Sequence, residues 1–295
     1  MNIEMVKGNN LKIVLFWKEL VMNNENETRL IIIGGGEDKK ADKEILKEVV
    51  KRSGGKNAEI AVITTATNYP LEVGEEYKQI FYDLGVEKVD TINIMNRQEA
   101  NRKQIIRSLE GITCIFFVGG DQLRISSILG GTNFHKFIHE AVNQGVIIAG
   151  TSAGASMMSE VMVVSGEEEG APKKSAISLA SGMGFLKGVI IDQHFNQRGR
   201  IGRLLGAVAQ NPQPLGMGID EDTAIIVNDI DEIEVIGSGV VTIVDGKEIE
   251  YTNISEQYPD EPLVITNVKV HTLPSGYGFK LRDRKAIIQE KKSKH

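Results

Sequence analysis

Short, almost continuously apolar runs alternate with amphipathic segments through the first half of the chain. The apolar runs are rich in β-branched residues and cover 29–35, 58–66, 87–94, 112–120 and 146–152. Because nearly every position in them is apolar, they predict strands buried on both faces. The segments 41–53, 70–85, 96–111 and 134–145 carry apolar residues three and four apart, which predicts helices. Regular alternation of strand and helix predicts a doubly wound, mostly parallel α/β sheet with right-handed crossovers.

The pattern changes after residue 225. Segments 231–253 and 264–281 contain short runs of alternating apolar residues joined by glycine and asparagine turns. They predict antiparallel strands added to the same domain near its C-terminus. We therefore expect a single α/β domain over residues 28–290, with peripheral tails at 1–27 and 291–295.

Composition and charge narrow the classes of protein. The chain has 295 residues, 41% hydrophobic and 25% charged, as globular proteins do, and its net charge is -6. This acidic balance argues against a nucleic-acid partner. The single cysteine, Cys114, has no partner for an internal disulfide, which favours a reducing compartment. No apolar run approaches the roughly 18 residues of a membrane span. We read no signal peptide at the start and predict a cytoplasmic protein without a membrane partner.

Three glycine-rich turns follow predicted strands: "GGGEDK", "VGGDQ" and "GTSAGA". Ligands of parallel sheets bind at the carboxyl ends of the strands, where these turns would converge. The first turn invites a dinucleotide interpretation, and a non-enzymatic nucleotide or metabolite binder is the alternative class of function. However, a third glycine is missing where Lys39 stands, and no acid ends the second strand. We interpret Gly34 to Asp38 as a turn that shapes the edge of a site.

The third turn fits the pattern G-x-S-x-G, with Ser152 at its centre. Small neighbours let the chain reverse from strand to helix and leave the serine hydroxyl exposed at the tip. The N–H of Ala153 would then point toward an oxyanion, and the next helical turn would add positive potential. The alternative is a glycine-rich turn that merely needs a compact residue. The predicted flanking strand and helix favour a nucleophile.

A serine nucleophile needs a base, and His194 is the best candidate among five histidines. It follows the apolar segment "GVIID" at the end of a predicted strand. His135 and His139 would share one helix face, where a metal pair is conceivable. They lack the glutamate of H-E-x-x-H and a third ligand, so a solvated helix face is favoured. We expect no metal and no cofactor.

An acid must orient the base, and two segments offer one. "GIDEDTA" supplies Glu221 and Asp222, whereas the loop "SGEEEGAPKK" supplies Glu167, Glu168 and Glu169. Runs of acids usually form solvated loops. We favour Glu221, and Asp222 and Glu169 remain alternatives.

Five segments in order, "GGGEDK", "FVGGDQLRI", "GTSAGA", "DQHFNQRGRIGRLL" and "GIDEDTA", closely resemble the cyanophycinase family between residues 30 and about 228. These serine exopeptidases are related to the aspartyl dipeptidases. The resemblance implies an α/β fold of the class I glutamine amidotransferase type and a homodimer. It also matches Ser152, His194 and Glu221 to the family's triad. Together with the turn type, it makes the N–H of Gly120 a second oxyanion donor. The implied substrate pocket comprises Gln122, Asp192, Gln193, Arg198, Arg200 and Arg203.

The resemblance implies cyanophycin as the substrate, a polyaspartate with arginine on each β-carboxyl, which the family cuts to β-aspartyl-arginine dipeptides. Arginine forks suit its carboxylates and an acid such as Asp192 suits its guanidinium groups. A helix or turn beginning at Arg198 would not direct all three arginines to one pocket. An aspartyl dipeptidase, or another hydrolase of small acidic peptides on this fold, is the alternative enzyme.

Overall fold

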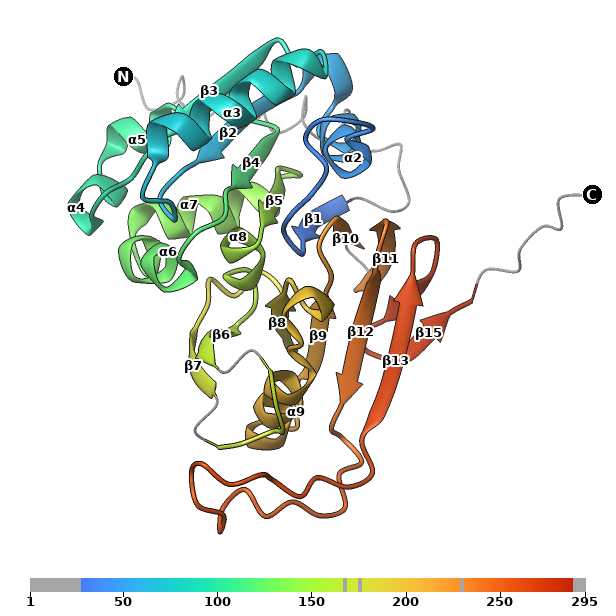
Figure 1. Cartoon of the computed structure of the whole chain (residues 1–295). Helices are drawn as coiled ribbons and strands as arrows, with labels where there is room; N and C mark the ends of the chain where they lie inside the picture. The colour runs from blue at the N-terminus through green and yellow to red at the C-terminus, as the bar shows by residue number, and fades with distance from the viewer. Residues whose placement is uncertain (1–27, 167–168, 175–176, 229–230, 289–295) are drawn as a thin grey trace, which may run out of the picture.

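The computed structural model describes residues 28–166, 169–174, 177–228 and 231–288. The predicted tails at 1–27 and 291–295 lie outside the described residues. Figure 1 shows a parallel α/β layer formed by the first half of the chain, above a second sheet formed largely by the second half.

The core of the first sheet consists of the five strands expected from the apolar runs. They are β1 (Thr28–Ile33), β2 (Glu59–Ile63), β3 (Lys88–Ile92), β4 (Cys114–Phe117) and β5 (Ile147–Thr151). They lie parallel in the order β1-β5-β4-β2-β3. The predicted α/β class with a mostly parallel core is therefore confirmed. Strand β3 is the edge strand, so only its Val89 and Ile92 are buried.

Helices cover both faces of this parallel core. On one face, α2 (Glu44–Arg52) and α3 (Pro70–Asp83) pack against side chains such as Ile31, Val62 and Phe116. On the other face, α6 (Gln122–Leu129) and α7 (Asn133–Val142) pack against neighbours such as Ile32 and Phe117. Alternate residues of each strand thus enter two separate apolar layers, which explains why the strands are apolar throughout.

Two helices differ from the sequence prediction. The expected helix over 96–111 is divided into α4 (Arg97–Ala100) and α5 (Lys103–Arg107). The Asn101 side chain donates to the Arg97 carbonyl at 2.8 Å and competes with helical continuation. Helix α6 was not predicted, because only Ile125 and Leu129 of its residues are buried. Its start is set by Asp121, whose carboxylate accepts from the backbone N–H groups of the first turn.

Antiparallel strands extend the first sheet and build a second one. β10 (Thr223–Asn228), β11 (Glu232–Gly237), β14 (Gly278–Lys280) and β15 (Lys285–Ile287) continue the first sheet beyond β1. The second sheet has the order β13-β12-β9-β8, with β8 (Val189–Gln193), β9 (Leu215–Ile219), β12 (Val240–Asp245) and β13 (Lys269–Pro274). The expected C-terminal antiparallel strands are confirmed, and the structure adds that β12 and β13 belong to a separate sheet.

The chain crosses between the two sheets twice at one place. Residues 220–222 lead from β9 to β10, and residues 238–239 lead back from β11 to β12. The two crossings contact each other, since the Ser238 N–H donates to the Asp222 carbonyl at 2.8 Å. The carboxyl ends of β1, β8 and β9 therefore meet at this junction, where Gly34 and Thr223 are also hydrogen-bonded.

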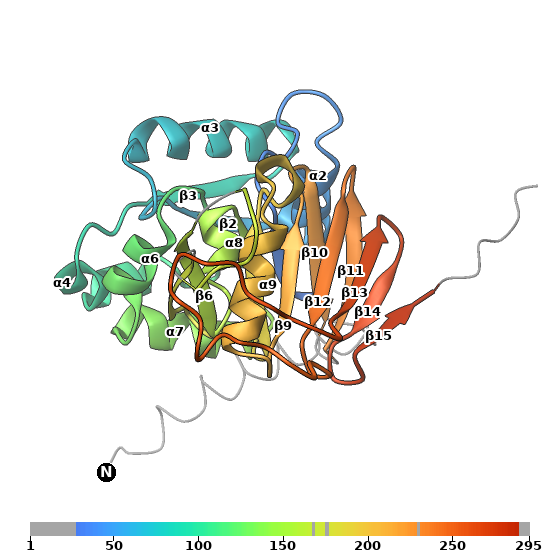
Figure 2. The same cartoon turned by 60° about the horizontal axis from the view of Figure 1, so that its bottom comes forward.

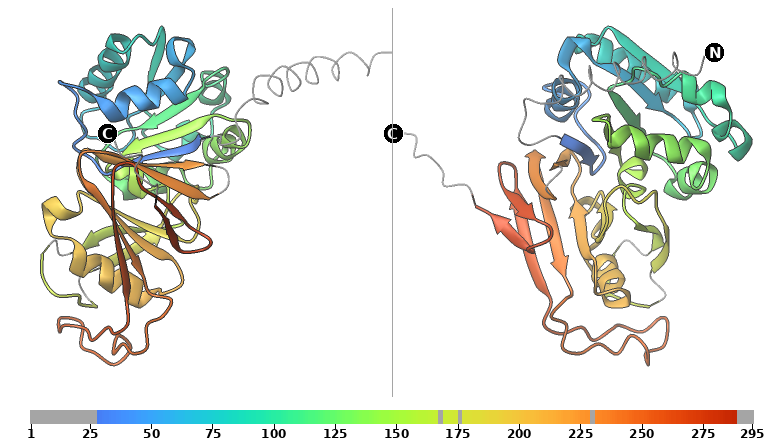
Figure 3. Two further views of the ribbon diagram at one scale, coloured as in Figure 1. Left: turned by 90° about the vertical axis from the view of Figure 1, so that its right-hand side faces the viewer. Right: turned by 180° about the vertical axis from the view of Figure 1, so that it is seen from behind.

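The remaining elements surround α9 (Ile201–Gln210), which follows the 3-10 turn η2 (Asn196–Arg198). A hairpin of β6 (Val161–Gly166) and β7 (Ile177–Ser181) lies beside it, and short elements α8 (Ala153–Ser156) and η1 (Gly55–Asn57) complete the fold. The long connection between β12 and β13 passes below α9 (Figures 2 and 3). It is fixed there by the Leu263 N–H, which donates to the Pro172 carbonyl at 2.8 Å. No helix in the described ranges is long and apolar enough to span a membrane.

Candidate active site

Ser152 occupies the turn between β5 and α8, with φ 53° and ψ -109°. The flanking glycines make this turn possible. A β-carbon on Gly150 would lie 2.5 Å from the Gly154 carbonyl oxygen, and one on Gly154 would lie 2.3 Å from that of Phe117. Only glycine fits at both positions, as the G-x-S-x-G pattern requires. The following helix is a single turn, shorter than the sequence suggested, and it contributes correspondingly little dipole.

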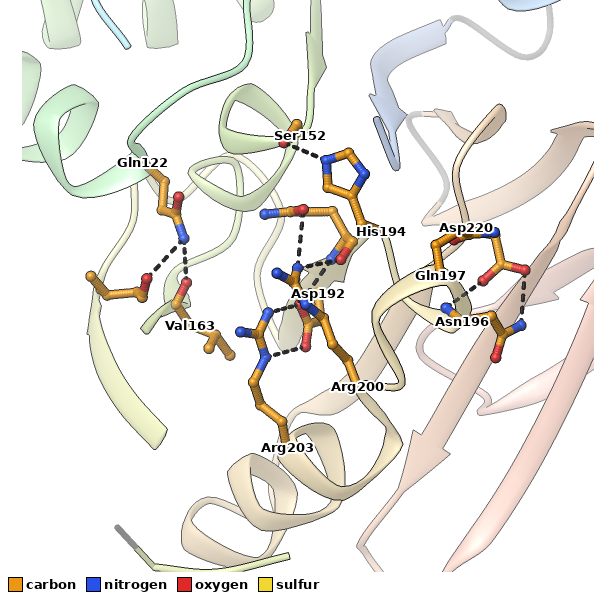
Figure 4. A network of polar contacts seen from close by, with 12 residues as sticks. Gln122, Ser152, Val163, Asp192, His194, Asn196, Gln197, Arg200, Arg203 and Asp220 are labelled. Atoms are coloured by element: carbon orange, nitrogen blue, oxygen red, sulfur yellow. Dashed lines mark hydrogen bonds and ion pairs between the residues drawn. The ribbon is translucent and has the colours of Figure 1, made fainter. Parts of the chain in front are cut away.

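His194 follows β8 and faces Ser152 (Figure 4). Its Nε2 lies 2.9 Å from the Ser152 Oγ, and its Nδ1 lies 2.6 Å from the Glu221 Oε1. A carboxylate only accepts, so Nδ1 carries the proton and Nε2 is left to accept from the serine hydroxyl. The carboxylate thus fixes the tautomer in which His194 is a base toward Ser152.

Burial lowers the pKa of His194 below its ordinary value, and the positive charges of Arg198 and Arg200 act in the same direction. The hydrogen bond from Glu221 opposes this shift. The side chain of His194 is 13% exposed, whereas that of Glu221 is 40% exposed. Solvent screens the charge of Glu221, so its direct hydrogen bond to Nδ1 is its main influence on the imidazole. Near neutral pH the imidazole is unprotonated and able to accept a proton.

The other candidate acids have different surroundings. Asp222 Oδ1 accepts from the Asp38 N–H at 2.9 Å, and Asp222 Oδ2 accepts from the Ser238 hydroxyl at 2.7 Å. Asp222 therefore binds the glycine-rich turn and the second crossing, whereas its neighbour Glu221 binds the imidazole. Glu169 is exposed in the loop between β6 and β7, and Glu167 and Glu168 lie outside the described residues.

The turn from Gly34 to Asp38 lies directly against the base and the acid. The Gly34 carbonyl accepts from the His194 N–H at 2.8 Å, and the Gly35 carbonyl accepts from the Asp222 N–H at 2.9 Å. A β-carbon on Gly35 would lie 2.3 Å from His194 Cε1, and one on Gly36 would lie 3.0 Å from the Glu221 carboxyl carbon. The run of glycines allows the backbone to approach both side chains.

Glu37, in the same turn, is a buried acid that sequence reasoning overlooked. Its Oε2 accepts from the Thr151 hydroxyl at 2.6 Å and its Oε1 from the Tyr77 hydroxyl at 2.5 Å. Burial, with the charge of Glu37 next, raises the pKa of Tyr77 well above its ordinary value, so this hydroxyl remains a donor. Glu37 thereby links the glycine-rich turn to the residue that precedes Ser152. An acid between a glycine turn and a charged helix start gave no signal of this burial.

The second glycine-rich turn borders the nucleophile. A β-carbon on Gly119 would lie 3.4 Å from Ser152 Cβ, and Gly120 follows with φ 142°. Gln122 begins α6, and its side-chain amide donates to the Val163 carbonyl at 2.8 Å. The predicted oxyanion donor Gly120 and the predicted pocket residue Gln122 thus belong to the turn that adjoins Ser152, together with Ala153, the first residue of α8.

Asp192, Arg200 and Arg203 form a buried charge cluster beside His194 (Figure 4). Arg203 binds both carboxylate oxygens of Asp192, with its Nε 2.8 Å from Oδ2. Arg200 reaches Asp192 Oδ1 at 3.4 Å and Gln193 Oε1 at 3.2 Å. The fork of Arg203 therefore has a carboxylate partner inside the protein. Arg198 differs from both, because it is exposed.

His135 and His139 do not form the solvated face that the sequence favoured. Both are partly buried, their Nε2 atoms are 2.9 Å apart, and they approach the Met183 carbonyl at 3.0 and 2.8 Å. His135 Nδ1 accepts from the Gly131 N–H at 2.9 Å, so its Nε2 carries the proton. That tautomer suits donation to Met183 and disfavours metal binding through Nε2. Among the described residues, no group of three or more His, Cys, Asp or Glu side chains could hold a metal ion.

A serine at a strand-to-helix turn, hydrogen-bonded to a histidine that is hydrogen-bonded to a glutamate, is the arrangement of the serine hydrolases. The family model for peptidase family S51 matches residues 30–236. The chain therefore belongs to peptidase family S51, and it is a peptidase.

Relatives and a solved structure agree with this membership. The chain is 39% identical over 262 residues to a cyanophycinase from Trichormus variabilis, covering 88% of each protein. It is 40% identical over 254 residues to a cyanophycinase from Synechococcus elongatus, covering 86% of this chain and 79% of the relative. The fold resembles that of a peptidase from an acI-B1 Actinobacterium, with a TM-score of 0.62 at 22% identity, over 86% of this chain and 97% of that one.

Proposed function

We propose that this peptidase is a serine exopeptidase that hydrolyses cyanophycin and releases β-aspartyl-arginine dipeptides. The observation that carries the proposal is the chain of contacts from the Ser152 Oγ to His194 Nε2, at 2.9 Å, and from His194 Nδ1 to Glu221 Oε1, at 2.6 Å. Identity near 40% to two cyanophycinases supports the choice of substrate.

In the first half of the reaction, the Ser152 Oγ attacks the carbonyl carbon of the scissile peptide bond. The hydroxyl proton passes to His194 Nε2, and Glu221 stabilises the imidazolium that forms. The N–H groups of Gly120 and Ala153 would stabilise the oxyanion of the tetrahedral intermediate. His194 then gives its proton to the leaving amine, the carbon–nitrogen bond breaks, and an ester to Ser152 remains.

In the second half, water attacks this ester while His194 Nε2 takes one of its protons. A second tetrahedral intermediate collapses, the bond to Ser152 Oγ breaks, and the proton returns to the serine. The products are a carboxylic acid and the free enzyme. Each step uses a proton position that the tautomer of His194 provides.

The proposed substrate pocket comprises Gln122, Asp192, Gln193, Arg198, Arg200 and Arg203. The cluster of Asp192, Arg200 and Arg203 forms one wall beside His194, since all three side chains are at most 7% exposed. Arg198 is exposed and offers its guanidinium to a substrate carboxylate. We also propose a homodimer and a cytoplasmic location for the protein.

Incubation with purified cyanophycin, followed by mass analysis of the products, tests the proposal. We expect β-aspartyl-arginine dipeptides, and labelling of Ser152 by a fluorophosphonate that ends turnover. Turnover of aspartyl dipeptides without attack on the polymer would assign the narrower dipeptidase activity. Absence of labelling and of hydrolysis would favour a binding protein.

A further inference from the structure

Asp220 is a buried acid, 4% exposed, that directly precedes Glu221 in the first crossing between the sheets. Its Oδ1 accepts from the Asn196 backbone N–H at 3.1 Å, and its Oδ2 accepts from the Asn196 side-chain amide at 2.9 Å. Asn196 lies two residues after His194. One carboxylate therefore holds the turn that carries the base to the turn that carries the acid (Figure 4).

A second contact joins the same two turns in the opposite direction. The side-chain carbonyl of Gln197 accepts from the Glu221 backbone N–H at 3.0 Å. Asp220 and Glu221 are thus both bound by consecutive residues, Asn196 and Gln197, of the turn after His194. This reciprocal pairing holds the two backbones at the separation at which His194 Nδ1 meets Glu221 Oε1 at 2.6 Å.

Asp220 also holds the second crossing between the sheets. Its Oδ2 accepts from the Val240 N–H at 3.2 Å, and its own backbone N–H donates to the Val240 carbonyl at 3.3 Å. Gly239 leaves room for this contact, because a β-carbon there would lie 2.8 Å from Asp220 Cβ. The exposed side chain of Glu221 has no comparable support from burial. The position of Glu221 therefore depends on backbone contacts that its neighbour makes.

From these contacts we infer that Asp220 is a positioning residue, whose carboxylate aligns Glu221 with His194. The inference rests on the proposed roles of those two residues. Only a carboxylate satisfies the site, because three donors converge on its two oxygens. An asparagine would turn an amide donor toward at least one of them.

The first measurement compares the wild-type protein with Asp220→Asn on cyanophycin. We expect kcat to fall by about 10- to 100-fold with little change in KM, the scale of a small misplacement of a reacting group. The acidic limb of the kcat/KM profile should move to lower pH, because the Glu221 hydrogen bond raises the pKa of His194 and would be weakened. An unchanged kcat and an unmoved limb would overturn the inference.

The decisive measurement is a double-mutant cycle with Glu221→Gln. If Asp220 acts through Glu221, Asp220→Asn should cost less than about 3-fold in kcat once Glu221→Gln is present. An equal loss in both backgrounds would overturn the inference and leave the proposed function intact. If Glu221→Gln alone left kcat unchanged, the assigned triad would fail together with the inference.

Two further variants separate positioning from stability. Asn196→Ala removes one donor to Asp220 from an exposed residue and should give a smaller kcat loss with the same shift of the acidic limb. It covers the case in which Asp220→Asn does not fold. Asp245→Asn alters another buried aspartate of the second sheet, one that accepts from the Lys247 N–H at 2.9 Å. It should lower the melting temperature without changing kcat. Loss of kcat in proportion to melting temperature across all three variants would overturn the inference.

Discussion

Gly35 lies against the imidazole of His194, so closely that a β-carbon on the glycine would come within 2.3 Å of Cε1. The backbone at Gly35 also has φ 99°, which side chains rarely adopt. The glycine-rich turn therefore limits where the base can lie, and it leaves the imidazole no room to rotate away from Ser152.

Gly35→Ala should displace the His194 ring and lower kcat/KM by about 100-fold or more. Gly85→Ala is a matched control, because Gly85 has φ 88° and nothing within 4 Å of an added β-carbon. That control shares the backbone strain without the clash, so it should lose stability and keep its activity. Equal activity losses in the two variants would assign the effect to strain and not to the imidazole.

Ser152→Ala should abolish turnover and fluorophosphonate labelling while the protein stays folded. Loss of a triad nucleophile typically costs several orders of magnitude in rate. The backbone bonds of the turn, such as that from the Ser152 N–H to the Ile33 carbonyl at 3.0 Å, do not need the hydroxyl. Steady-state rates and a thermal unfolding curve check both parts. Residual activity near the wild-type level would exclude Ser152 as the nucleophile.

The acidic limb of the kcat/KM profile should lie below the ordinary pKa of histidine, because burial lowers the pKa of His194. His194 must be neutral to accept the serine proton, so activity is lost as the pH falls through its pKa. Arg198→Gln removes a positive charge that lowers this pKa, and the limb should therefore move to higher pH. An ester without carboxylates separates this effect from substrate binding. Movement to lower pH would contradict the assignment of His194 as the base.

Arg203→Lys should lower the free energy of unfolding by about 1–3 kcal/mol, because lysine keeps the charge but loses the fork that binds the buried Asp192. Arg52→Lys is the control, since its ion pair with Glu48 is 25% exposed on the arginine side and should be worth about 0–1 kcal/mol. Denaturant unfolding measures both. An unchanged stability with a loss of kcat/KM on cyanophycin alone would instead indicate direct contact between Arg203 and the substrate.

Activity should be indifferent to EDTA. The proposed proton transfers involve Ser152, His194 and Glu221, and the Gly131 N–H keeps His135 in the tautomer that is unsuited to a metal at Nε2. Rates before and after dialysis against chelator check this expectation. Loss of activity that zinc restores would direct attention to His135 and His139.

The strands and the candidate nucleophile could be predicted from the sequence because each depends on local pattern. Continuous apolar runs indicate buried parallel strands, and the glycines around Ser152 reflect contacts within one turn. The division at Asn101 and the start of α6 depend on single side-chain hydrogen bonds, which periodicity does not register. The second sheet depends on pairing between β9 and β12, whose order along the chain does not specify which sheet they join.

The acids show the same distinction. Nothing in "GIDEDTA" separates three neighbouring acids, yet Asp220 contacts Asn196, Glu221 contacts His194 and Asp222 contacts Asp38. Their roles follow from the directions in which a crossing between two sheets points successive side chains. Burial of Glu37 and the internal pairing of Arg203 with Asp192 likewise depend on segments that are distant in sequence.

Ser152, His194 and Asp222 all have positive φ, at 53°, 49° and 48°. For residues with a side chain, such backbone conformations cost of order 1–3 kcal/mol each. Glycine would relieve the strain at any of these positions, but at Ser152 and His194 it would remove the groups proposed to carry out the reaction. Selection for greater thermal resistance would thus oppose selection for turnover at these very residues. Heat-tolerant descendants of this enzyme should owe their added stability to substitutions elsewhere, while the three turns keep their costly geometry.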